Sequence, residues 1–297
     1  MHQYIQEIEI IAPWFFPLVS FVVGACVGSF LNVCIYRIPE DLSIIHPPSR
    51  CGACGTPIPF YRNVPILAWI ILRGKAACCG APFSIRYPAI EFLTGVLFLA
   101  SWLLLPPASA VIGMVWISIL VAITFIDLDH MIIPDRFSIG GLFVGVILSA
   151  FVPSLHGIHL DHAILAGIQG MFTAIQGALI GSAIILWIMI LAEIILKKEA
   201  LGFGDVKLMG AIGAFCGWQG AIFALFGGAV LGTIAIVILQ LVKFVTPKKE
   251  NADEDEGMIG REVPFGPMLA AGSLLYFLYL GPKVDWYFGQ FNWVLNQ

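Results

Sequence analysis

The chain has 297 residues, of which 59% are hydrophobic and only 11% are charged, and its formal net charge is −4. Soluble domains carry about 25% charged residues, so this composition predicts a polytopic membrane protein. The slightly acidic balance provides no polyanion-binding surface, which argues against a nucleic-acid-binding protein.

Apolar windows of roughly 20 residues, the length that crosses a bilayer, recur along the chain. They predict an all-α integral membrane protein with about eight transmembrane helices, at 12–36, 88–105, 108–126, 136–153, 173–196, 206–220, 222–245 and 264–281. The apolar run 163–196 is too long for one span, and an interfacial helix at its start would account for the excess.

Lys and Arg predict the orientation, because they are concentrated in cytoplasmic loops. If the predicted spans alternate strictly, every Lys and Arg except Lys283 falls on the same side of the membrane. That side is therefore predicted to be the cytoplasm, with both termini on the outer side. We divide the chain into a first transmembrane helix at 1–36, a small cytoplasmic domain at 37–87 and a membrane domain at 88–297.

The predicted cytoplasmic domain contains a cysteine pattern, Cys51-x-x-Cys54 followed by the adjacent Cys78 and Cys79. Tetrahedral zinc is bound by four such thiolates, and structural disulfides are rare in the cytoplasm. The pattern therefore indicates a zinc ribbon, with unmetallated cysteines as the alternative.

Two aspartates lie at the cytoplasmic ends of predicted spans. Asp127 ends the third span, and Asp205 follows Gly202 and Gly204 at the start of the sixth. Two carboxyl groups in a low-dielectric site share a proton, so one can activate water while the other polarises a peptide carbonyl. This pattern predicts an aspartic protease. Alternatively, a lone aspartate at a helix end is an interfacial residue or a cap, and Asp205 or Asp135 would then cap the next helix. Asp129 is the alternative partner of Asp205, because two positions turn a helix by about 200°.

Three histidines on the predicted outer side, His156, His159 and His162, are spaced by three residues. Such spacing can place ligands on one helix face and hold a metal. The surrounding sequence favours an ordinary periplasmic loop instead.

Several further segments carry a family resemblance: Gly28–Ser29–Phe30–Leu31–Asn32–Val33 with Arg37, Cys51–Gly52–Ala53–Cys54, Asn63–Val64–Pro65, Arg86–Tyr87–Pro88 with Glu91, and Pro264–Phe265–Gly266–Pro267. With the Asp127 motif and the stretch from Gly202 to Lys207, they resemble the bacterial type IV prepilin peptidases, inner-membrane aspartyl proteases of the GxGD class. The resemblance covers almost the whole chain. It implies that Asp127 and Asp205 are the catalytic pair, with Gly202, Gly204 and Lys207 as supporting motif residues.

The resemblance also implies a substrate and a second reaction. Such enzymes remove a basic leader from type IV prepilins and type II secretion pseudopilins, after a Gly and typically before a Phe. Many then methylate the new N-terminal amine with S-adenosylmethionine. Four polar residues near the predicted membrane boundary are candidates for a cofactor or leader site, although interfacial anchoring explains each equally well: Asn32, Arg37, Arg86 and Glu91.

The cysteine pattern departs from that of the family at one position. Where the family has a second C-x-x-C, this chain reads Ala76–Ala77–Cys78–Cys79, so the third ligand position is Ala76. Cys78 is a candidate substitute with altered geometry, and water or another side chain are the alternatives.

Two competing functions belong to other classes. A transporter would use Asp127 and Asp205 to couple protons or cations, although both lie at one face of the membrane and no inverted repeat is evident. A zinc-ribbon scaffold of a secretion complex would leave the two aspartates unexplained.

Overall fold

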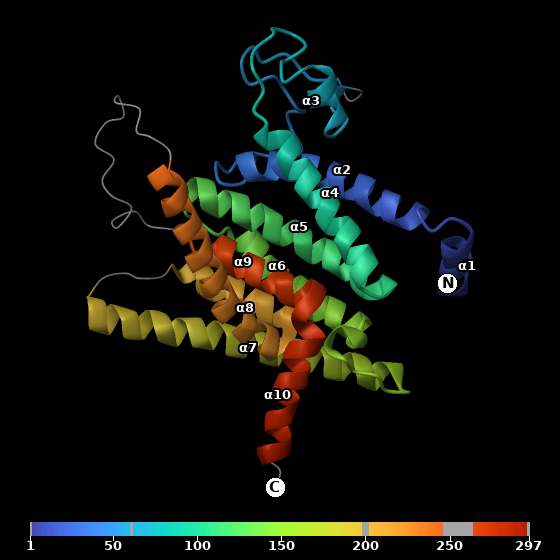
Figure 1. Cartoon of the computed structure of the whole chain (residues 1–297), viewed down its shortest axis with the longest axis vertical. Helices are drawn as coiled ribbons and strands as arrows, with labels where there is room; N and C mark the ends of the chain where they lie inside the picture. The colour runs from blue at the N-terminus through green and yellow to red at the C-terminus, as the bar shows by residue number, and fades with distance from the viewer. Residues whose placement is uncertain (1, 60–61, 198–201, 246–263, 296–297) are drawn as a thin grey trace. The chain divides into compact units, whose positions relative to one another are not determined.

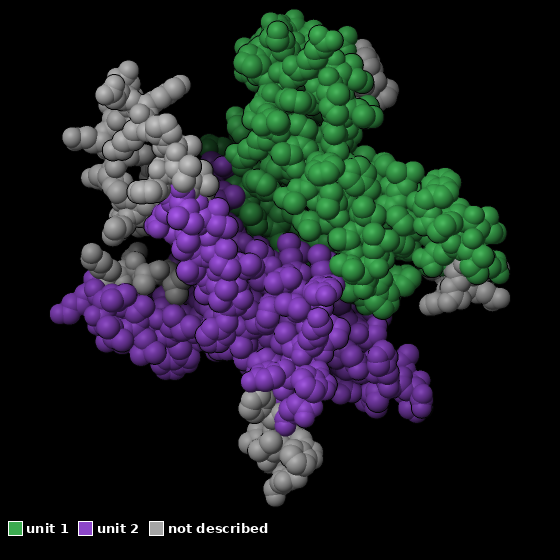
Figure 2. Space-filling model, in the orientation of Figure 1, with its two compact units in different colours: residues 1–126 green, residues 127–297 purple. Residues whose placement is uncertain are grey.

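The computed structural model describes residues 2–59, 62–197, 202–245 and 264–295 (Figure 1). Over these ranges the chain is helical and has no strand, only two isolated β-bridges, Arg50 with Pro57 and Lys75 with Pro82. The predicted all-α class is therefore confirmed. The chain divides into two compact units, residues 1–126 and 127–297, which Figure 2 shows in different colours.

Unit 1 contains the helices α1 (His2–Ile11), α2 (Phe15–Arg37), α3 (Leu67–Ile71), α4 (Arg86–Leu104) and most of α5 (Pro107–His130). Helix α2 packs along α4, and glycines allow the close approach. A Cβ on Gly28 would lie 2.8 Å from the Cα of Glu91, and a Cβ on Gly24 would lie 2.8 Å from Phe98. The loops that carry the cysteines, together with α3, lie beyond the N-terminal end of α4 (Figure 1).

Unit 2 contains α6 (Asp135–Phe151), η2 (Pro153–His156), α7 (Ala163–Leu196), α8 (Phe203–Val245), α9 (Gly266–Leu275), η4 (Tyr276–Leu280) and α10 (Gly281–Leu295). Helices α7 and α8 meet at Gly177 and Gly213, where each backbone leaves no room for a Cβ on the other. The N-terminal half of α8, which carries Asp205, is thereby fixed against α7.

Helix α8 is interrupted at Gly217, whose φ of 69° and ψ of 178° are non-helical. This region of backbone space is open essentially to glycine alone, so the residue type permits the kink. The kink lies inside the predicted span 206–220, a few residues before the predicted boundary with the span 222–245.

Five of the described helices, α2, α4, α5, α7 and α8, are long and apolar enough to cross a membrane. Helix α7 has 34 residues and is continuous, so the predicted span 173–196 is its C-terminal part. Helix α6 has 17 residues, and the predicted last span corresponds to α9 and η4. The multi-pass architecture is thus supported, while the number of eight spans remains a prediction. The basic residues at 198, 248, 249 and 261 that contributed to the orientation lie outside the described residues.

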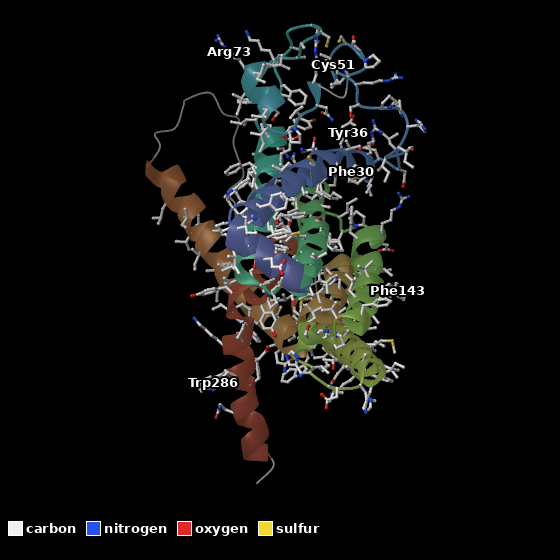
Figure 3. The ribbon with its side chains drawn as sticks, turned by 90° about the vertical axis from the view of Figure 1, so that its right-hand side faces the viewer. Phe30, Tyr36, Cys51, Arg73, Phe143 and Trp286 are labelled. Carbon is white, nitrogen blue, oxygen red and sulfur yellow. The ribbon has the colours of Figure 1, made fainter. Side chains whose placement is uncertain are left out.

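Large apolar side chains lie on the outer surfaces of these helices. Phe30 on α2 is 51% exposed, and Phe143 on α6 is 62% exposed (Figure 3). Exposed apolar surface of this kind marks an interaction with a membrane or with another protein. In a chain of this composition, the surface is suited to contact with lipid.

The three histidines of the predicted outer loop do not form a cluster that could hold a metal. Among the described residues, only four cysteines do so. His159 and His162 are exposed, whereas His156 Nε2 lies 2.9 Å from Ser149 Oγ of α6. Burial lowers the pKa of His156 to about 4, so the ring is neutral at physiological pH.

Candidate functional site

Two buried carboxyl groups lie at the helix ends where the sequence predicts them. Asp127 lies in the last turn of α5 and is 5% exposed, and Asp205 lies in the first turn of α8 and is 8% exposed. The two groups are close enough to interact electrostatically. Asp129 is exposed on α5, so the rotation of the helix selects Asp127 as the buried member.

A third segment of unit 2 reaches the same place. The backbone N–H of Gly266, at the start of α9, donates a hydrogen bond of 3.1 Å to Asp127 Oδ2. A Cβ on Gly266 would lie 2.6 Å from that oxygen, so the contact requires glycine. In the sequence, the Pro264–Phe265–Gly266–Pro267 segment contributed only to the family resemblance. Its proline and glycine at a helix start were the signal that could have indicated this role.

Ile133, which follows α5, lies against both the Gly–x–Gly–Asp stretch and the start of α9. A Cβ on Gly204 would lie 3.1 Å from Ile133 Cβ, and a Cβ on Gly266 would lie 3.3 Å from Ile133 Cδ1. The Gly–x–Gly–Asp stretch, the residues after α5 and the start of α9 therefore converge around one isoleucine. Gly202 lies farther away, and a Cβ there would be 3.8 Å from Asp205 Oδ2.

This arrangement can carry out acid–base chemistry on a peptide bond. In a low-dielectric site, two neighbouring carboxyl groups do not both ionise easily, so they hold one proton between them. The ionised member can accept a proton from water, and the protonated member can donate to a carbonyl oxygen.

Lys207 does not contact either of these aspartates through any described interaction. Its Nζ lies 2.6 Å from Asp135 Oδ1 and 5.3 Å from the centre of the Phe203 ring. The ion pair joins the N-terminal part of α8 to Asp135, the first residue of α6.

The cysteine region of unit 1 consists of two similar turns. In the first, Cys51 N–H donates to Thr56 O, and Gly55 N–H donates to Cys51 O. In the second, Ala76 N–H donates to Ala81 O, and Gly80 N–H donates to Ala76 O. Both turns end on a glycine with positive φ, 70° at Gly55 and 72° at Gly80. The second turn has thus kept the backbone of a metal-binding knuckle, although Ala76 occupies its first position.

The positions of the sulfur atoms show how the cluster obtains a fourth ligand although position 76 is an alanine. All four Sγ atoms, from Cys51, Cys54, Cys78 and Cys79, lie within 4.8 Å of one another. Cys51 and Cys79 are 3.7 Å apart, and Cys54 and Cys78 are 3.2 Å apart. Zn–S bonds of about 2.3 Å in a tetrahedron place the sulfurs about 3.8 Å apart. The donor set therefore fits zinc, with Cys78 in place of the missing ligand.

The charge state of the cysteines also favours a cation. A hydrogen bond with Thr56 lowers the pKa of Cys54 to about 6, whereas the neighbouring Cys54 sulfur raises the pKa of Cys78 to about 12. If all four cysteines lost their protons, the thiolates would repel one another at these distances, and a divalent cation would remove the repulsion.

The four polar residues predicted near the membrane boundary have separate surroundings in unit 1. Asn32 Nδ2 donates to Tyr87 O at 3.2 Å, and Arg37 Nη1 donates to Ser43 O at 2.9 Å. The Arg86 guanidinium lies 5.4 Å from the centre of the Phe125 ring. Glu91 is 9% exposed, and its Oε2 accepts the N–H of Ile66 at 2.7 Å. Of the four, Glu91 alone lines the cavity beside the cysteines.

Comparison with known proteins identifies the family. Residues 22–105 match the bacterial peptidase A24 N-terminal domain, and residues 114–237 match the type IV leader peptidase family. A prepilin leader peptidase/N-methyltransferase of Legionella pneumophila is 32% identical over 93% of this chain and 96% of its own length. The chain belongs to the type IV leader peptidase family.

Other relatives carry the same name. The prepilin leader peptidase/N-methyltransferase of Myxococcus xanthus is 37% identical over 81% of this chain and 68% of its own length. That of Aeromonas hydrophila is 30% identical over 94% of this chain and 96% of its own length. No solved structure matches the chain.

Membership confirms the resemblance seen in the sequence motifs and makes the chain a membrane peptidase. The alternatives of a transporter and of a non-catalytic scaffold are therefore set aside. The boundary between the two matched regions, near residues 105–114, falls within or beside α5, so the cysteine region and the buried aspartates belong to different parts of the family pattern.

Proposed function

We propose that the chain removes the basic leader from type IV prepilins and type II secretion pseudopilins at the cytoplasmic face of the bacterial inner membrane, with Asp127 and Asp205 as the catalytic pair. In the same proposal, the chain then methylates the new N-terminal amine with S-adenosylmethionine. The observation that carries the peptidase assignment is the burial of these two carboxyl groups beside Gly204 and Gly266 in a member of a leader peptidase family.

The cleavage step follows from the shared proton. The ionised carboxylate takes a proton from a water molecule as that water attacks the scissile carbonyl carbon. The protonated carboxyl donates a hydrogen bond to the carbonyl oxygen, and a proton then passes to the leaving amine. No covalent intermediate forms. The Gly266 N–H fixes one oxygen of Asp127, which keeps the carboxyl in one orientation through the cycle.

The substrate class is consistent with the predicted topology. A basic leader stays in the cytoplasm while the apolar helix behind it remains in the bilayer. The scissile bond then lies at the cytoplasmic boundary of the membrane, where the predicted orientation places the C-terminal end of α5 and the N-terminal end of α8. Both termini of the chain are predicted to be periplasmic.

The cysteine cluster is proposed to hold a structural zinc. Cys51, Cys54, Cys78 and Cys79 would bind it, and the bound ion would fix the two turns relative to each other. It has no step in peptide cleavage.

The test is an assay of the purified chain in detergent with a prepilin, with and without S-adenosylmethionine. Mass spectrometry should show loss of the leader and, with the donor present, a further increase of about 14 Da, one added CH₂. A chain that leaves several prepilins and pseudopilins intact would refute the proposed substrate. Cleavage without the mass increase would refute the methylation alone.

A further inference from the structure

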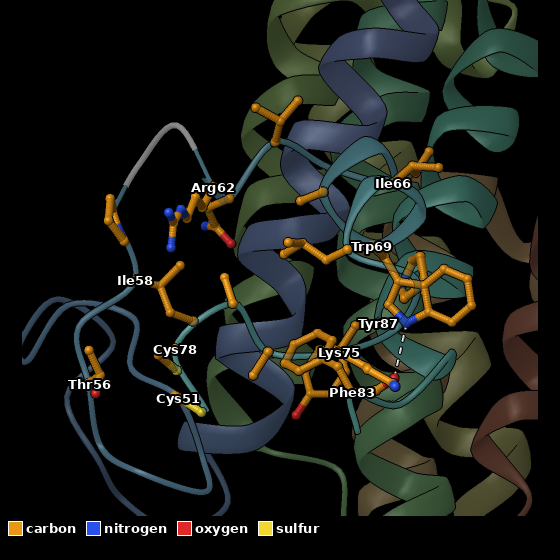
Figure 4. A pocket seen from close by; sticks show the side chains of 18 of the residues that line it. Cys51, Thr56, Ile58, Arg62, Ile66, Trp69, Lys75, Cys78, Phe83 and Tyr87 are labelled. Carbon is orange, nitrogen blue, oxygen red and sulfur yellow. Dashed lines mark hydrogen bonds between the residues drawn. The ribbon is translucent and has the colours of Figure 1, made fainter. Parts of the chain in front are cut away.

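Unit 1 has a cavity of about 230 Å³ between the cysteine turns, α3 and the start of α4 (Figure 4). Sites that enclose drug-sized ligands measure roughly 300–1,000 Å³, so this cavity suits a nucleoside-sized group with the rest of the ligand at its mouth. Its lining combines aromatic rings, one buried carboxyl group and two basic residues: Trp69, Phe83, Tyr87, Glu91, Arg62 and Lys75.

The aromatic side of the cavity is rigidly built. Trp69 Nε1 donates a hydrogen bond of 3.0 Å to the backbone carbonyl of Phe83, shown as a dashed line in Figure 4. The rings of Phe83 and Tyr87 stack with their centres 4.5 Å apart. Phe83 and Tyr87 are each still 38% exposed. Accessible aromatic surface lining a cavity favours a flat, electron-poor or cationic ligand.

The charged residues of the lining further limit the class of ligand that fits the cavity. Glu91 is 9% exposed and is held in place by the Ile66 N–H, so its carboxylate is presented from a fixed position. A buried carboxylate favours a ligand with a positive charge. Arg62 and Lys75 also line the cavity, and they favour a ligand that carries an anionic group as well.

We propose that this cavity is the binding site for the methyl donor. S-adenosylmethionine combines the features that the lining selects, a flat purine, a sulfonium cation and a carboxylate. Trp69, Phe83 and Tyr87 would hold the purine, Glu91 would balance the sulfonium, and Arg62 and Lys75 would receive the carboxylate. This assignment rests on the proposed methyltransferase function.

The reaction that the bound donor supplies is a methyl transfer. The lone pair of the new N-terminal amine attacks the methyl carbon, the N–C bond forms as the C–S bond breaks, and the sulfonium becomes a neutral thioether. The amine nitrogen then releases one proton to solvent. Glu91 therefore balances a charge that is present before the transfer and absent afterwards, which favours release of the thioether product.

The test measures binding directly. Titration calorimetry with S-adenosylmethionine would be carried out on the full chain in detergent, for wild type, Glu91→Gln, Trp69→Leu and the control Glu40→Gln. Glu40 is an exposed acid of unit 1 that does not line the cavity. We expect the Kd to rise at least about tenfold in Glu91→Gln and Trp69→Leu. We expect the Kd of Glu40→Gln to match that of wild type, with the zinc content of every variant unchanged.

A second measurement keeps the proposal testable if a variant fails to fold. Irradiation of wild type with an azido-adenine analogue of the donor should label a peptide within residues 62–91, and excess S-adenosylmethionine should suppress the labelling. Labelling confined to other segments, or variants that bind as wild type does, would overturn the site while leaving the methyltransferase function intact. A wild type that cleaves prepilin but neither binds nor uses the donor would refute the methyltransferase function, and the site with it.

Discussion

The cysteine region and the aspartate site are held in place by different means. Over the described part of residues 41–87, only Cys51 is buried, so the turns and α3 have almost no apolar core. Around Asp205, by contrast, the first half of α8 is packed with fully buried side chains, including Leu208, Met209 and Ile212. One region is organised by four sulfur atoms, and the other by close helix packing.

This difference indicates which kind of substitution should disrupt each region. A segment without an apolar core depends on a crosslink such as a bound metal ion, and removing that crosslink should unfold the whole segment together. A packed helix end tolerates the loss of one polar contact but not an added atom, because the neighbouring backbones have no space to move. Changes to the four cysteines that are proposed to bind zinc and changes to the glycines should therefore affect the two regions separately.

The largest effect is expected for the metal ligands. In Cys78→Ser, the compensation for Ala76 is lost, and zinc measured by mass spectrometry should fall from about one per chain to near zero, since structural zinc needs four ligands. Cys26→Ser, on an exposed position of α2, is the matched control and should retain the metal. A Cys78→Ser protein with full zinc would show that another group completes the site.

The next effect concerns the helix contact at Asp127. In Gly266→Ala, the new Cβ would displace the Asp127 carboxyl, and we expect prepilin cleavage to slow by about 100-fold, as displacements near 1 Å can do. Gly140→Ala is the control, because a Cβ there meets nothing within 4 Å. Equal cleavage by the two variants would separate the Gly266 contact from catalysis.

Acid should destabilise unit 2 through His156. Its folded pKa of about 4 lies below the unfolded value of about 6.5, so its contribution is complete above pH 6.5 and is lost as the pH falls toward 4. The loss amounts to at most about 3 kcal/mol, at about 1.36 kcal/mol per pKa unit. Thermal unfolding in detergent at pH 7 and pH 5 should show a smaller shift for His156→Gln than for wild type. Parallel shifts in the two proteins would assign the acid effect to other groups.

The smallest effect is expected for the ion pair between Lys207 and Asp135. Both side chains are partly exposed, so the pair should contribute about 0.2–1 kcal/mol to stability. A double-mutant cycle with Lys207→Met and Asp135→Asn, followed by chemical unfolding, measures this coupling. A coupling of several kcal/mol would mean that Lys207 takes part in the aspartate site itself.

The apolar pattern of the sequence predicted the helical class and located most helices within a few residues. It did not predict that 163–196 forms one helix, because apolar composition gives the extent of a run but not whether it bends. It divided α8 into the spans 206–220 and 222–245, but the helix is interrupted at Gly217, inside the first of these, because no hydropathy pattern reveals a backbone conformation.

The site was partly predictable for a similar reason. Both Asp127 and Asp129 were candidates from the sequence, and packing decided the rotation of α5 that buries Asp127. The Gly266 contact joins residues 139 positions apart, and local sequence cannot indicate such a pairing. Cys78 was a candidate ligand, but only the distances between the four sulfur atoms, which local sequence does not give, show how it can replace the ligand missing at Ala76.

The central claim is that Asp127 and Asp205 together cleave the leader. The most direct measurement compares prepilin cleavage by wild type, Asp127→Asn, Asp205→Asn and Asp129→Asn at equal protein concentration in detergent. We expect the first two variants to lose cleavage by at least about 1,000-fold, as in sites where residues act as one unit, while Asp129→Asn stays close to wild type. Cleavage retained by Asp127→Asn or Asp205→Asn, or lost only in Asp129→Asn, would contradict the assignment.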